Sequence, residues 1–127
     1  MKAPLFVGTY RLGVWNVRLY VSRAPMDSGA SFRYCPGDGG CAKLVVGGVG
    51  RIWSDVLSGL LHEALESQLH QRGAGHVRTH EARETTCDYV FFLSHNTFDQ
   101  CCDFAARFVA ECLPDLQKAW RRVNKER

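Results

Sequence analysis

The chain has 127 residues, of which 46% are hydrophobic and 23% charged, with 16 Lys and Arg against 13 Asp and Glu. These proportions are typical of one globular domain over residues 1–127, long enough to bury a core without disulfides, and they exclude disulfide-scaffold and disordered classes. No segment approaches the roughly 18 apolar residues that a bilayer span needs. The N-terminus also lacks the longer apolar run of a signal peptide, so we expect a cytoplasmic protein with no membrane partner.

The formal net charge of +3 gives no strong reason to expect nucleic acid as a partner. Such binding would need Arg11, Arg18, Arg23 and Arg33 to gather on one sheet face. The strand period permits this for only some of them, so nucleic acid is an unlikely partner.

The first half of the chain indicates a sheet. Residues 14–21 alternate between apolar and polar side chains, which predicts a half-buried strand. Residues 24–40 are rich in Gly, Pro and Asp and indicate a loop, with room for a short strand at 32–34. Residues 42–46 form a second predicted strand.

Cysteines flank the glycine-rich part of this loop. Cys35 and Cys41 could close a turn or hold a metal, but two thiolates without two further ligands make no zinc site, so a plain hairpin loop is favoured. All six cysteines are expected to be reduced thiols.

The second half indicates two helices. Apolar residues recur at helical spacing from Gly50 to His70. Residues 74–86 are polar, and 87–93 are typical of a central strand. The second helix has Thr97 as its expected N-cap with Gln100 as capping-box partner, and Pro114 should break or kink it. The sequence therefore predicts an α+β fold, a small antiparallel or mixed sheet with two long helices packed on one face.

The candidate chemistry lies on the first helix, in the sequence His62-Glu63-Ala64-Leu65-Glu66. His62 and Glu66 fall about 40° apart on the polar face, where they could share one cation. Zinc accepts both ligand types, and Glu63 could take a proton from metal-bound water. Gly59 leaves room on this face for a strand, a ligand or a metal.

A zinc site needs a third ligand from elsewhere in the chain. His95 is preferred, because it follows the predicted strand and precedes a helix. The other candidates are His80, Glu81, Asp99 and His70. The alternative is that these side chains form a solvated helix face, which requires no metal.

These residues resemble a known family. The segment from Gly48 through Glu66 is similar to the strand and HExxH helix of small zincin-like metallopeptidases of the phage and prophage type. The segments 89–95 and 98–120 also resemble the C-terminal part of such proteins. The resemblance implies a minimal zincin-like core, with His62 as a zinc ligand and Glu63 as the general base.

Glu66 stands where the zincin pattern has its second histidine. A carboxylate can bind zinc, but its negative charge lowers the acidity of metal-bound water. Two functions therefore stay open. One is a small zinc-dependent peptidase or hydrolase that acts on peptides, with His62, Glu66 and His95 as ligands. The other is a non-catalytic phage- or mobile-element-encoded protein that binds a host protein, for example a defence-system inhibitor.

Overall fold

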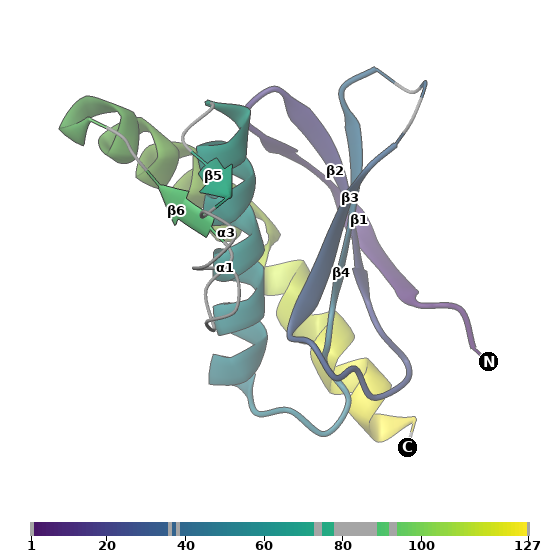
Figure 1. The fold of residues 1–127 in the computed structure, drawn as a ribbon. Helices are drawn as coiled ribbons and strands as arrows, with labels where there is room; N and C mark the ends of the chain where they lie inside the picture. Colours follow the sequence, from purple (N-terminus) through teal and green to yellow (C-terminus); the bar gives the residue numbers. More distant parts are fainter. Residues whose placement is uncertain are drawn as a thin grey trace.

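The computed structural model describes residues 2–35, 37, 39–72, 75–77, 89–91 and 94–126. Figure 1 shows a main sheet with two long helices on one of its faces, which confirms the predicted α+β class. The elements of this layer pair are β1 (Leu5–Leu12), β2 (Trp15–Val21), β3 (Ala30–Tyr34), β4 (Cys41–Val46), α1 (Trp53–Gln71) and α3 (His95–Lys125).

The four strands form a mixed sheet in the order β1-β2-β4-β3. β1 and β2 are an antiparallel hairpin, and β2 pairs in parallel with β4. β3 precedes β4 in the chain but lies outside it, paired antiparallel. Consequently β1 and β3 are the two edge strands.

Three of these strands match the predictions for 14–21, 32–34 and 42–46. β1 was not predicted. Its register shifts between Phe6 and Gly8, so a bulge interrupts the alternation by which a half-buried strand is recognised.

Alternation in the central strands directs one set of side chains to the helices. Val17, Leu19 and Val21 of β2 are fully buried, as are the alternate residues of β4. The helices contribute their apolar stripes to the same core, with these buried members: Val56, Leu60, Ala64, Ala105, Phe108, Cys112, Leu116, Ala119 and Val123. The helical spacing thus predicted the packed faces of both helices correctly, although Ile52 and Leu61 at the margins of the first stripe are exposed.

The N-terminus of α3 differs from the prediction. Ser94, not Thr97, is the N-cap: its backbone is extended and its hydroxyl accepts a hydrogen bond from the Thr97 N–H. Gln100 instead accepts a hydrogen bond from Arg72 at the end of α1. Pro114 does not break the helix, which continues to Lys125. Pro114 and Ala110 are both exposed, so water can satisfy the Ala110 carbonyl that lacks an N–H partner.

The prediction of a central strand at 87–93 was wrong. β6 (Tyr89–Phe91) pairs with β5 (Gly75–Val77) in a separate two-stranded sheet. An apolar segment is compatible both with a central strand of the main sheet and with a strand of a separate small sheet, so its composition did not distinguish these two placements.

Within the described part of the chain, no helix combines the length and apolar character needed to cross a bilayer.

Candidate functional site

The predicted pair on α1 does come together. The His62 Nε2 atom lies 2.9 Å from Glu66 Oε2, and the second carboxylate oxygen of Glu66 lies 3.7 Å from His70 Nε2. The three side chains form one row along the exposed side of the helix. Since residues eight positions apart are about 12 Å apart along a helix, His62 and His70 cannot both bind one ion.

His95 lies elsewhere. It is the first residue of α3, its side chain is 86% exposed, and its Nε2 atom lies 3.3 Å from Asp99 Oδ2 in the same helix. His95 and Asp99, both candidates for the third ligand, therefore contact each other. His80 and Glu81 lie outside the described residues.

The predicted zinc ligands do not come together as a set of three in the described part of the chain. Over the residues that the structure describes, no group of three His, Cys, Asp or Glu side chains is placed to hold a metal ion. His62 and Glu66 supply two donors, which is one fewer than a catalytic zinc site requires. Zinc binding therefore stays a prediction.

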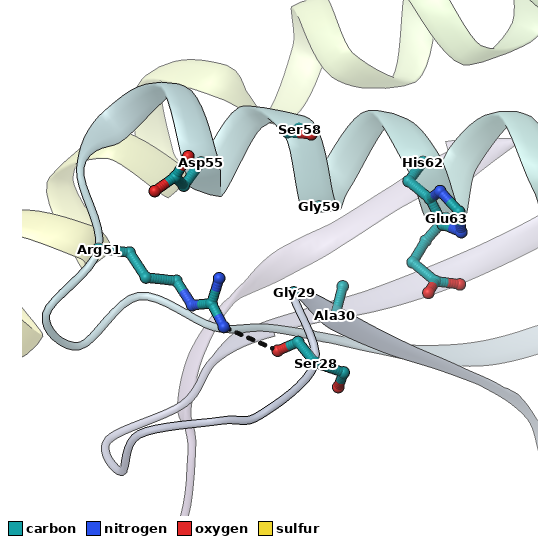
Figure 2. Close-up of a pocket in the computed structure, with 9 residues that line it drawn as sticks. All are labelled: Ser28, Gly29, Ala30, Arg51, Asp55, Ser58, Gly59, His62 and Glu63. Atoms are coloured by element: carbon teal, nitrogen blue, oxygen red, sulfur yellow. Dashed lines mark hydrogen bonds between the residues drawn. The ribbon is translucent and has the colours of Figure 1, made fainter. Parts of the chain in front are cut away.

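A groove runs between α1 and the chain entering β3, and two of the predicted residues line it. Figure 2 shows Arg51 and Asp55 at one end, Gly59 in the middle, and His62 and Glu63 at the other end. The cavity has a volume of about 350 Å³, and its other lining residues are Ser28, Gly29, Ala30 and Ser58. The groove places the predicted base beside a strand.

Two glycines set the width of the groove. A Cβ atom added to Gly59 would lie 2.8 Å from the carbonyl oxygen of Gly29. The helix and the entry to β3 therefore approach to backbone contact, which only glycine permits here. The expectation that Gly59 leaves room for a neighbour is confirmed, and the neighbour is the chain just before a strand.

Arg51 holds the loop side of the groove in place. Its Nη2 atom donates hydrogen bonds to the carbonyl oxygens of Met26 (2.7 Å) and Ser28 (3.1 Å). Its own carbonyl accepts a hydrogen bond from Trp120 Nε1 at 2.9 Å, which ties the same point to α3. Sequence analysis did not identify Arg51, because its partners are backbone atoms of a loop without a recognisable motif.

Glu63 points from α1 into the groove (Figure 2). Burial raises the pKa of Glu63, the negative charge of Glu66 raises it further, and His62 opposes the shift. A carboxylate with a raised pKa is a stronger base than a solvated one, which suits proton transfer.

The outer edge of β3 runs beside this groove. Gly47 N–H donates to the Gly29 carbonyl and Cys35 N–H donates to the Cys41 carbonyl, so the odd-numbered residues of β3 direct their backbone groups to β4. The N–H and C=O groups of Ala30, Phe32 and Tyr34 therefore point to the free edge. Within the described chain no strand pairs with that edge.

Cys35 and Cys41 lie side by side across the β3–β4 hairpin, with their Sγ atoms 3.2 Å apart. This agrees with the favoured interpretation of the segment as a hairpin loop. No third metal-binding side chain joins them among the described residues.

Comparisons with protein-family models, with curated proteins and with solved structures find no match to this chain.

Proposed function

We propose that this protein binds an extended peptide along the free edge of β3 and that Glu63 acts on the bound peptide as the general base of a hydrolase. The observation that carries the proposal is the position of an unpaired strand edge next to the groove that holds His62 and Glu63. Strand edges bind extended peptides through main-chain hydrogen bonds, without needing a particular peptide sequence.

The edge offers both kinds of contact that such binding needs. The backbone groups of Ala30, Phe32 and Tyr34 supply donors and acceptors at every second residue. Their side chains face the helix side, where Tyr34 packs at 4.4 Å from the Trp15 ring and at 5.2 Å from Phe32, centroid to centroid. This aromatic cluster would contact alternate side chains of a peptide.

The chemistry would take place at the His62–Glu63 end of the groove. Glu63 would take a proton from a water molecule that attacks a peptide carbonyl, and would then deliver a proton to the leaving amine. His62 lies on the same lining and can donate a hydrogen bond to the carbonyl oxygen when its Nε2 carries the proton.

Cleavage of casein, an unfolded protein, tests the hydrolase. Wild-type protein, assayed with and without added zinc, should produce new N-termini, whereas Glu63→Gln should cut at least about a hundredfold more slowly because it lacks the base. Equal cleavage by the two proteins would contradict the role of Glu63.

Ala30→Pro tests the binding edge separately. It removes an N–H that points away from β4, so the fold should remain intact while peptide affinity falls. Ser31→Pro is the matched control, because it removes an N–H directed to β4 and should lower the melting temperature instead. Unchanged peptide binding by Ala30→Pro would rule out docking on this edge.

The zinc prediction has its own measurement. Elemental analysis of protein purified without chelators should find about one zinc per chain in the wild type and little in His62→Ala. A His95→Ala variant should retain the metal if His95 pairs with Asp99, as the structure shows, and lose it if His95 is a ligand.

The second function left open by the sequence is a non-catalytic interaction protein. The same free edge favours it, because docking on β3 requires neither Glu63 nor a metal. Peptide binding that survives in Glu63→Gln, together with absence of casein cleavage by the wild type, would select this second function.

A further inference from the structure

The sheet has one face that the helices leave uncovered. Figure 1 shows α1 and α3 on one side of the sheet. Their buried side chains share a core with Val17, Leu19 and Leu44. The intervening residues of each strand point the other way and are mostly exposed. We call this the open face. Its members are Phe6, Thr9 and Arg11 of β1, Asn16, Arg18 and Tyr20 of β2, Cys41, Lys43 and Val45 of β4, and Ser31 and Arg33 of β3.

Three cations lie in one row across the open face. Arg18 of β2 is the register partner of Lys43 of β4, and Lys43 is the register partner of Arg33 of β3. Neighbouring strands are about 4.8 Å apart, and like charges directly opposite each other destabilise a sheet. The four strands contain no Asp or Glu at all. Lys43 and Arg33, directly opposite each other, therefore repel one another in the isolated protein, and a bound anion would relieve that repulsion.

Two further features adjoin the row. A cavity of about 160 Å³ is lined by Arg33, Lys43, Ser31 and Val45, large enough for one phosphate group with its hydration. Arg11 lies one row along β1 and adds a fourth cation to the same face.

An aromatic pair lies on the side of the row opposite Arg11. Phe6 and Tyr20 are register partners, their ring centroids are 5.3 Å apart, and Phe6 is 52% exposed. The Lys43 ammonium lies 4.9 Å from the centre of the Tyr20 ring. Cations beside an exposed aromatic surface are the two requirements for binding single strands, whose phosphates need charge and whose bases need a surface to stack on.

We propose that the open face binds single-stranded nucleic acid, with phosphates over Lys43 and Arg33 and a base stacked on Phe6. An acidic peptide would use the cations but gain little from the rings. A duplex has its bases already stacked within it and offers none to Phe6. The charge complementarity is local, which is why the small net charge of the chain did not predict it.

Fluorescence anisotropy with a labelled oligothymidylate and an oligouridylate tests the proposal. The wild type should bind with an affinity that falls steeply with salt. A double variant, Arg33→Gln with Lys43→Gln, should bind at least about tenfold more weakly at low salt, and its log–log salt slope should be shallower by about 1.4 because two phosphate contacts are lost.

Two further variants separate base stacking from the effect of positive charge. Phe6→Ala should weaken binding by about fivefold or more with an unchanged salt slope, because it removes stacking but no charge. Arg121→Gln removes one exposed cation from α3 and should leave both affinity and slope unchanged.

Several outcomes would overturn the proposal. They are absence of oligonucleotide binding by the wild type, an equal loss in Arg121→Gln, tighter binding to duplex than to single strands, and binding only to polyglutamate or to phosphatidylserine vesicles. Melting temperatures of all variants should stay within a few degrees of the wild type, since every substituted side chain is on the surface.

Discussion

Tyr10 joins the sheet to the second helix through a single polar contact. Its hydroxyl donates a hydrogen bond to Asp115 Oδ2 at 2.8 Å, and its ring packs edge-on against Phe108. Burial raises the pKa of Tyr10, and the hydrogen bond and negative charge of Asp115 raise it further. The contact between Tyr10 and Asp115 therefore makes the stability of the fold sensitive to alkaline pH.

The sign of this effect follows from proton linkage. Above the ordinary tyrosine pKa of about 10, unfolded chains lose a proton that Tyr10 keeps in the folded state, so stability falls as pH rises further. Urea unfolding from about pH 9 to about pH 11 should show a shallower loss of stability for Tyr10→Phe, by at most one proton. Burial also raises the pKa of Cys112, to about 12, but this contribution is shared by both proteins and cancels in the comparison. Parallel pH profiles would contradict the assignment.

Gly59 presents a conflict between helix propensity and packing. Alanine should favour the helix by about 1 kcal/mol, but its Cβ would lie 2.8 Å from the Gly29 carbonyl oxygen, and overpacking typically costs about 1–3 kcal/mol. We expect Gly59→Ala to lower the free energy of unfolding by about 1 kcal/mol. Ser58→Ala, at an exposed neighbouring position, should be neutral or slightly stabilising. Chemical denaturation measures both, and stabilisation by Gly59→Ala would show that the helix and the strand entry are farther apart.

At the scale of elements, the side chain of Asn124 joins the C-terminal end of α3 to the chain before α1. The Asn124 amide nitrogen donates to the carbonyls of Gly48 (3.1 Å) and Trp120 (2.8 Å), and its oxygen accepts from the Gly50 N–H at 3.0 Å. These bonds anchor the helix to the turn that leads into α1. The sequence did not predict this role, because Asn124 lies among polar residues at the end of a helix, where most side chains are solvated.

Asn124→Ala should therefore destabilise the protein by about 2 kcal/mol, because the two hydrogen bonds that join the helix to Gly48 and Gly50 are lost, each contributing about 1 kcal/mol. Lys125→Ala, at an exposed neighbouring position, is the control and should change stability by less than about 0.5 kcal/mol. Thermal unfolding of the three proteins provides the measurement. Equal melting temperatures would mean that water replaces the Asn124 amide at no cost.

At the scale of the whole molecule, periodicity predicted the parts that depend on local sequence. The two helices, their buried stripes and the strand at 14–21 follow from spacing, and the short strands at 32–34 and 42–46 from local composition. β1 escaped because its bulge disturbs the alternation, and β6 was assigned to the main sheet because an apolar strand does not indicate its neighbours.

What sequence could not supply was strand order. The row of Arg18, Lys43 and Arg33 exists because β4 inserts between β2 and β3, which are consecutive in the chain. The same order makes β3 an edge strand beside His62 and Glu63. For the candidate site, sequence therefore indicated the residues of α1 but not the strand beside them, nor the pairing of His95 with Asp99 in its own helix.

The parallel pairing of β2 with β4 also has a consequence for how the chain folds. It joins residues 25 positions apart, Asn16 with Cys41, whereas the turn between β1 and β2 joins near neighbours, and hairpins of that kind close in about 1–10 μs. Closing the longer loop costs more conformational entropy, and this cost precedes the stabilising contacts between the two strands. We therefore expect two hairpins, β1–β2 and β3–β4, to form early and independently, and their docking along the central seam to be the slow event that commits the molecule to its native topology.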